Sequence, residues 1–324
     1  MGMSRRDMFG DGARGEPAAP GSYGRPPVGH RLPEGTRLGP VSIQVADLER
    51  SLEFYGSVLG LRVLEHGGAR ATLGPEQQDR VLIELVERPG ARPAGGTGRL
   101  GLFHFAILLP DRAALGRLVR HLMQSGIHPG AADHLVSEAF YLNDPDGHGI
   151  EVYADRPRSA WRRVGRELMI ATDPVDLAAV LRAGGEATWT GMPAGTVIGH
   201  VHLHVGDLDE AADFYAEGLG LDLTTWSYPG ALFLGAGGYH HHLGTNTWAG
   251  PGARPPEDDA ARLLAWTIEL PDTNELESVR AQLDRRGHPV EGRGAGELLT
   301  RDPWGTTVRL RVDAPAPTGG GGSS

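Results

Sequence analysis

Histidine and acidic side chains that could bind a metal recur along this 324-residue sequence, which contains no cysteine. His104 and Glu151 each stand inside an apolar run, His200 begins the alternating series 200–204, and three consecutive histidines occupy 240–242. Without thiolates, any transition metal must be held by imidazole nitrogens and carboxylate oxygens. Two histidines with one carboxylate suit a non-haem Fe(II) centre that keeps open coordination positions.

Each of these residues also has a purely structural interpretation. A lone histidine on an apolar strand, such as His104, is more often a hydrogen-bonded core residue than a ligand. Glu151, between two apolar neighbours, could form a cross-strand ion pair. The three histidines of the series 200–204 share one face of a strand, so at most one of them need be a ligand. The tract 240–242 could be strand surface or an adventitious metal-binding segment.

Composition and charge exclude several classes of partner. The formal net charge of -10, without a run of Lys or Arg, gives no basic patch for nucleic acid or an anionic membrane. No stretch reaches the ~20 apolar residues that span a bilayer, and no apolar segment follows the N-terminal charges. The length allows two domains with cores of their own. We therefore expect a cytoplasmic protein that acts on small molecules, and a homo-oligomer is compatible with the sequence.

An internal repeat places the candidate residues on predicted elements. The segment 39–61 returns as 199–221, and both copies contain Phe-Tyr followed by Leu-Gly-Leu. Each copy begins with the alternation of a strand. The spacing then becomes helical after an aspartate at the N-cap position, Asp47 or Asp207. A weaker repeat inside each copy predicts four strand-helix-strand units, near residues 40–95, 101–155, 198–250 and 262–312.

Units of this kind predict an α+β protein in which paired βαβββ units curl a sheet around a cleft. Both ends are rich in Gly and Pro and lack hydrophobic periodicity, which is typical of tails. The predicted organisation is a disordered tail over 1–35, an N-terminal domain over 36–156, a connector over 157–195, a C-terminal domain over 196–312 and a flexible tail over 313–324.

The repeated pattern of an alternating strand, an aspartate cap, Phe-Tyr and Leu-Gly-Leu resembles the vicinal oxygen chelate superfamily, which contains glyoxalases, bleomycin resistance proteins and extradiol dioxygenases. Residues 103–112 and 236–248 are further similar to two-domain catechol 2,3-dioxygenases of the bacillus type. The resemblance implies two vicinal oxygen chelate domains, each made of two βαβββ units that form a curled sheet around a metal cleft.

In this superfamily the metal ligands lie on the first and last strands of the units. The first-strand positions here are Pro40, His104, His200 and Ala265, and the last-strand positions are Glu84 or a neighbour, Glu151, His241 and Arg309. The resemblance thus implies a metal held by His104, Glu151 and His200, with Fe(II) favoured and Mn(II) as the alternative. These ligands belong to units two and three, so the site would join the two halves of one chain or of two chains.

The resemblance also implies three catalytic residues. His241 falls at the position of an acid-base histidine that takes a proton from a catechol and returns it later. Tyr141 corresponds to a tyrosine that contacts the substrate, and His134 is a candidate donor behind it. Alternation along a strand predicts that His240 and His242 turn away from the site. Trp248 is interpreted as a packing aromatic.

These observations favour an extradiol dioxygenase that inserts both atoms of O2 into catechol or a substituted catechol. Two alternatives remain open on the sequence. A glyoxalase-like lyase or isomerase would use the metal without redox change, although it favours a second carboxylate where this chain has His241. A non-catalytic, antibiotic-binding protein of the same fold would usually lack the metal ligands.

Overall fold

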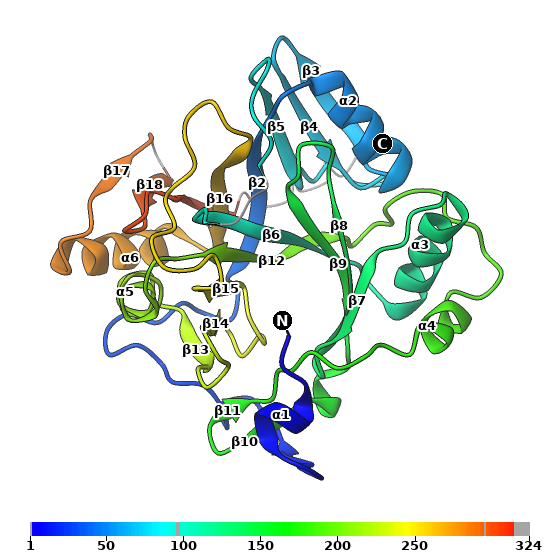
Figure 1. Ribbon diagram of the computed structural model, residues 1–324. Coiled ribbons are helices and arrows are strands. Elements are labelled where there is room, and N and C mark those ends of the chain that lie inside the picture. The colour runs from blue at the N-terminus through cyan, green and yellow to red at the C-terminus, as the bar shows by residue number, and fades with distance from the viewer. Residues whose placement is uncertain (1, 95–97, 295, 314–324) are drawn as a thin grey trace, which may run out of the picture.

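Two eight-stranded sheets form the body of the protein, and a computed structural model describes them over residues 2–94, 98–294 and 296–313 (Figure 1). The first sheet has the order β13-β14-β15-β12-β6-β9-β8-β7. Its strands are β6 (Gly101–Leu108), β7 (Gly130–Asp133), β8 (Ser137–Asn143), β9 (Gly149–Asp155), β12 (Val197–His204), β13 (Asp222–Thr225), β14 (Ala231–Gly235) and β15 (Leu243–Asn246).

The second sheet has the order β17-β18-β19-β16-β2-β5-β4-β3. Its strands are β2 (Arg37–Val45), β3 (Arg62–Gly67), β4 (Arg70–Gly74), β5 (Ile83–Glu87), β16 (Arg262–Leu270), β17 (Val290–Gly292), β18 (Glu297–Arg301) and β19 (Thr307–Val312). Together with the helices, these curled mixed sheets confirm the predicted α+β class.

Each sheet combines one unit from each half of the chain. In the first sheet β6 pairs antiparallel with β12, which joins units two and three. In the second sheet β2 pairs antiparallel with β16, which joins units one and four. Each sheet therefore takes strands from both predicted domains, 36–156 and 196–312. The boundaries of those domains stay a prediction.

Short helices cover the sheets, and aspartates begin most of them. The helices are α1 (Arg5–Phe9), α2 (Leu48–Glu53) continued by η1 (Phe54–Val58), α3 (Arg112–Gln124), η2 (Arg158–Ala160), α4 (Leu177–Ala183), α5 (Leu208–Ala212) continued by η3 (Asp213–Gly218), and α6 (Thr273–Arg285). The predicted caps are confirmed: Asp47 accepts the backbone N–H of Arg50, and Asp207 accepts that of Glu210. Both bonds satisfy an N–H that has no partner within its helix.

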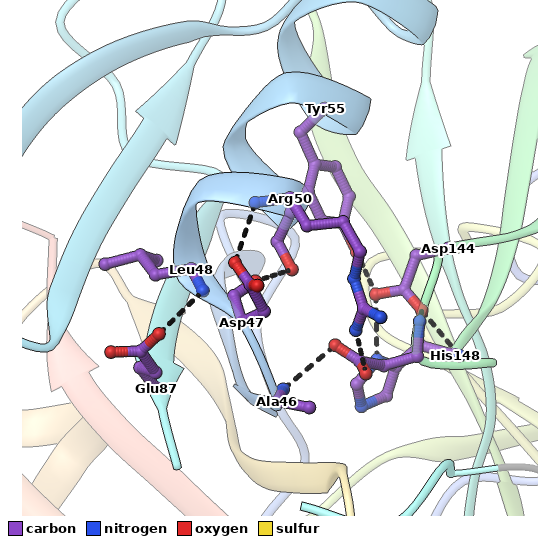
Figure 2. Close-up of polar contacts among 10 residues, drawn as sticks. Ala46, Asp47, Leu48, Arg50, Tyr55, Glu87, Asp144 and His148 are labelled. Atoms are coloured by element: carbon purple, nitrogen blue, oxygen red, sulfur yellow. Dashed lines mark hydrogen bonds and ion pairs between the residues drawn. The ribbon is translucent and has the colours of Figure 1, made fainter. Parts of the chain in front are cut away.

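A buried hydrogen bond joins the two units of each half, and Figure 2 shows the first of the pair. Tyr55, of the repeated Phe-Tyr pair, donates to Asp144 Oδ2 at 2.9 Å. The other oxygen of Asp144 accepts the backbone N–H groups of Asp146 and His148. The second copy repeats the bond at 2.8 Å, from the Tyr215 hydroxyl to Asp302. In each half of the chain, the tyrosine of the Phe-Tyr pair therefore donates to the aspartate of an Asp-Pro pair, at 144–145 and at 302–303.

The N-terminal segment differs from the predicted tail, because residues 2–35 pack on the body. Tyr23 and Leu32 are buried, and Arg25 stacks 3.7 Å from the centre of the Trp226 ring. Strand β1 (Glu16–Pro17) completes a small sheet with β10 (Arg162–Val164) and β11 (Glu167–Leu168). Only isolated residues of this segment contact the body, so their spacing in the sequence has no regular period.

Of the predicted C-terminal tail, residues 314–324 lie outside the described residues. Within the described part of the chain, no helix combines the length and the apolar character needed to cross a membrane.

Candidate metal centre and active site

Three neighbouring strands of the first sheet bring together the predicted metal ligands. His104 lies on β6, Glu151 on β9 and His200 on β12, and β6 lies between the other two strands. His104 Nε2 is 3.1 Å and His200 Nε2 is 3.3 Å from Glu151 Oε2. One donor atom from each residue falls within 4.8 Å of the others. The three side chains are thus close enough to share one ion.

The chemical state of these side chains fits a divalent cation. All three are buried; Glu151 Oε1 and His200 Nδ1 have no hydrogen-bond partner, and His104 Nε2 has none besides the nearby oxygen of Glu151. Burial alone would raise the pKa of Glu151, but the adjacent His200 and His104 outweigh it and hold this pKa well below its ordinary value. Burial lowers the pKa of His104, partly opposed by Glu151. An ionised carboxylate beside a neutral imidazole is the form in which these groups bind metals.

The equivalent place in the second sheet holds an ion pair instead of ligands. The strand register makes Glu84 the counterpart of Glu151. Glu84 pairs with Ser42, two positions after Pro40, and Glu151 pairs with Ala106, two positions after His104. Arg309 occupies the corresponding position on β19, and its Nη1 lies 3.2 Å from Glu84 Oε1. Here a guanidinium neutralises the carboxylate. Among the described residues, only the first sheet offers a cluster of metal-binding side chains.

Register corrects one position assigned from the sequence. His202 on β12 pairs with Gly244 on β15, so Gly244, not His241, is the last-strand equivalent of Glu151. His241 precedes β15, in the loop that follows β14. It nevertheless reaches the metal site, with its ring centre 4.2 Å from that of His200. The catalytic role predicted for His241 does not depend on a strand position and stays a prediction.

A cavity of about 250 Å³ opens beside the three candidate ligands. Its other lining residues are Gly2, Phe103, Ala132, His134, Tyr141, Ile170, Thr172, His202, Tyr228, Phe233, His241 and Trp248. The three residues predicted to be catalytic are therefore gathered around one space. A larger cavity of about 360 Å³ shares Phe103 with it but includes none of the candidate ligands.

Tyr141 and His134 form a hydrogen-bonded pair in the cavity wall. Tyr141 lies opposite Glu151 in the pairing of β8 with β9. His134 Nδ1 is 2.6 Å from the carbonyl oxygen of Ala171, so this nitrogen must carry a proton. With this proton on Nδ1, Nε2 of the ring is the nitrogen that accepts a hydrogen bond from the Tyr141 hydroxyl, at 2.5 Å. Burial and the Glu151 charge raise the pKa of Tyr141 well above its ordinary value, which keeps the phenol protonated.

The three consecutive histidines occupy a loop, so strand alternation does not describe them. His241 faces the cavity, and burial together with neighbouring imidazoles lowers its pKa well below the ordinary value. His242 accepts the backbone N–H of Ala236 at 3.1 Å, which closes the loop. His240 contacts His241 directly, at 2.6 Å between their Nδ1 atoms. As predicted, neither His240 nor His242 lines the cavity, although the reason is the course of the loop and not strand alternation.

Several residues of the cavity had no assigned role in the sequence. Trp248, expected to be a packing aromatic, lies at the cavity with 42% of its surface exposed. His202 also lines the cavity, and its Nε2 is buried without a partner. Gly2 and Thr172 come from the N-terminal segment and the connector, where no local pattern marks them. The repeated His-x-His spacing of β12 was the available signal for His202.

The comparisons with known proteins agree with this geometry. The sequence model of the Glyoxalase/Bleomycin resistance protein/Dioxygenase superfamily matches residues 37–152 and 197–310. The chain belongs to this superfamily. Within it, a catechol-2,3-dioxygenase of Bacillus subtilis (strain 168) is 45% identical over 262 residues, which cover 80% of this chain and 91% of that relative.

Solved structures of the superfamily share the fold. A putative dioxygenase from Bacillus subtilis superimposes with a TM-score of 0.59 at 15% identity, over 88% of this chain and 87% of that one. A mutant glyoxalase I from Zea mays gives a TM-score of 0.50 at 18% identity, over 86% and 92% of the two chains. Because this fold serves several chemistries, the reaction has to be argued from the site.

Proposed function

We propose that this superfamily member is an extradiol ring-cleaving dioxygenase that inserts O2 into catechol or a substituted catechol. The observation that carries the proposal is the buried His104–Glu151–His200 cluster, which opens into a largely aromatic cavity. The 45% identity to a catechol-2,3-dioxygenase supports the choice of substrate class. Fe(II), when bound by the three residues, would supply the electron transfer that lets O2 react with the ring.

The surrounding residues would position the catechol and handle its protons. Phe103, Phe233 and Trp248 line the cavity with aromatic rings that favour a flat aromatic ring and exclude water. The proton of the Tyr141 hydroxyl is engaged by His134, so the phenol oxygen offers lone pairs to a substrate hydroxyl. His241, neutral at pH 7 because of its lowered pKa, can accept a catechol proton.

The glyoxalase-like alternative is less well supported by this cavity. A lyase or isomerase that works without redox change favours a second carboxylate as its base. Glu151 is the acidic side chain among the described residues that line the cavity, and it belongs to the cluster itself. Beside this cluster the cavity presents the imidazole of His241 and no second carboxylate among the described residues.

The test is to load the protein anaerobically with Fe(II), add catechol, and then admit air. We expect O2 uptake, a yellow ring-fission product, and about one iron per chain. Glu151→Ala should lose both iron and activity, whereas Glu84→Ala, its counterpart in the second sheet, should keep the iron. Oxygen uptake that stays at the level of free Fe(II) would refute the dioxygenase. Turnover of a glutathione hemithioacetal with Zn(II) or Ni(II) would then identify a lyase.

A further inference from the structure

A chain of hydrogen bonds runs from Asp155, at the end of β9, through His240 to His241. His240 Nε2 lies 2.8 Å from Asp155 Oδ1, and His240 Nδ1 lies 2.6 Å from His241 Nδ1. His240 is fully buried, and 26% of the Asp155 side chain is exposed. The chain therefore leads from a partly solvated carboxylate to a ring that lines the cavity.

Aromatic side chains hold this arrangement in place. The Tyr239 ring lies against the His240 ring, with 4.1 Å between their centres, and the Trp161 ring lies 5.4 Å away. The Tyr239 hydroxyl donates to Asp155 Oδ1 at 3.3 Å and is itself bonded to the Tyr153 hydroxyl at 2.8 Å. The carboxylate and the first imidazole are thus fixed from several sides.

The direction of the hydrogen bonds follows from the chemistry of the groups. A carboxylate only accepts, so His240 Nε2 must carry a proton and donate it to Asp155. When His240 carries its single proton on Nε2, its Nδ1 is a lone pair that accepts a hydrogen bond from the Nδ1–H of His241. His241 therefore keeps its own proton on Nδ1, and its Nε2 is left as the unprotonated nitrogen. Because His241 lines the cavity, this is the nitrogen available to a substrate.

We propose that Asp155 and His240 are positioning residues that fix the tautomer and the ring orientation of His241. The inference rests on the proposed function, because it needs His241 to take a proton from the substrate. Without these hydrogen bonds, the His241 ring could rotate or carry its proton on Nε2, and neither form would accept a substrate proton. In serine proteases, replacing the aspartate that holds the catalytic histidine lowers kcat about 10⁴-fold through the wrong tautomer.

Two substitutions, each compared with a matched control, test the hydrogen bonds from Asp155 to His241. Asp155→Asn introduces an amide that can donate, so His240 Nε2 is no longer obliged to carry the proton. His240→Leu removes the acceptor for His241, whereas His240→Asn keeps an oxygen near the position of Nδ1. We expect Asp155→Asn and His240→Leu to lower kcat on catechol by about 10- to 100-fold, a part of the ~10²–10⁴-fold that acid-base assistance supplies. The KM and the iron content should change little, and His240→Asn should recover most of the rate.

His242→Asn is the control for the loop, because an amide oxygen can still accept the Ala236 N–H, and the hydrogen bond of the His242 ring is to Ala236 and not to the His241 ring. It should keep near-normal kcat. The decisive measurement is a double-mutant cycle with His241→Ala. If His240 and Asp155 act only through His241, Asp155→Asn or His240→Leu should cost nothing further in that background.

An equal fall in both backgrounds would overturn the positioning role and indicate general damage to the fold. Loss of iron in Asp155→Asn and His240→Leu would overturn it as well. A His241→Ala variant with full activity would remove the role of His241 in the reaction while leaving the dioxygenase assignment intact. Absence of O2 uptake by the unmodified, iron-loaded protein would instead reject the proposed function itself.

Discussion

Replacing His242 by asparagine should make the protein less sensitive to mild acid. Burial, reinforced by the neighbouring His240, lowers the pKa of His242 from 6.5 to about 3. The unfolded chain therefore takes up a proton near pH 6.5, whereas the folded protein resists protonation until about pH 3. Stability linked to this residue is complete above pH 6.5 and is lost as the pH falls toward 3.

The size of the effect follows from proton linkage. A single group of this kind lowers the free energy of unfolding by about 2 kcal/mol between pH 7 and pH 5. The asparagine side chain of the His242→Asn variant would not titrate, and its amide oxygen could still accept the Ala236 N–H. Urea unfolding of both proteins at pH 7 and pH 5 should show a loss in the unmodified protein that is larger by that amount. Equal losses would show that His242 is already protonated in the fold or has the same pKa when unfolded.

Three further predictions concern other parts of the molecule. Tyr55→Phe should lower the free energy of unfolding by about 1.5–3 kcal/mol, because Asp144 loses a buried, charge-assisted hydrogen bond. Tyr215→Phe should lower it by a similar amount. Unchanged urea unfolding of both variants would contradict the role of these tyrosines in joining the units. Removal of residues 1–9 should raise the KM for catechol without loss of iron, because Gly2 lines the cavity and the Met3 backbone forms hydrogen bonds with Tyr228 and Thr172. An unchanged KM would show that the segment does not border bound substrate. Residues 196–312 expressed alone should bind metal far more weakly than the full chain, because they supply only His200 of the cluster; metal analysis giving full occupancy would contradict the shared site.

The convergence of the three candidate ligands could be predicted because it depends on repeated, periodic elements. His104 and His200 occupy the same position in two copies of one strand, and Glu151 follows a turn that recurs in the fourth unit. Register in a sheet preserves such equivalences, which is why the pairing of units two and three could be expected from where the ligands fall. The same logic gave Glu84 or a neighbour as the last-strand position of unit one, and the structure shows Glu84 there, paired with Arg309.

What lay outside regular elements could not be predicted in the same way. His241 was placed on a strand, whereas it lies in a loop, and loop side chains follow hydrogen bonds instead of a period of two. The packing of residues 2–35 depends on single contacts with distant parts of the chain, such as Met3 with Tyr228. The bond between Tyr55 and Asp144 joins a residue of the repeat to one that lies 89 positions further along the chain, and no local pattern connects the two.

Each sheet combines one unit from each half of the chain, and this arrangement has a consequence for synthesis on the ribosome. Until residues 197–204 emerge, β6 lacks its partner β12, and β2 lacks β16 until residues 262–270 follow. A nascent N-terminal half therefore presents two unpaired strand edges at the centres of its future sheets, and such edges readily pair with another chain. Two copies that exchange their C-terminal halves would form the same strand pairs and the same clusters of candidate metal ligands. Expression at high protein concentration should therefore favour domain-swapped dimers, in which the candidate ligands of each cluster come from both polypeptides.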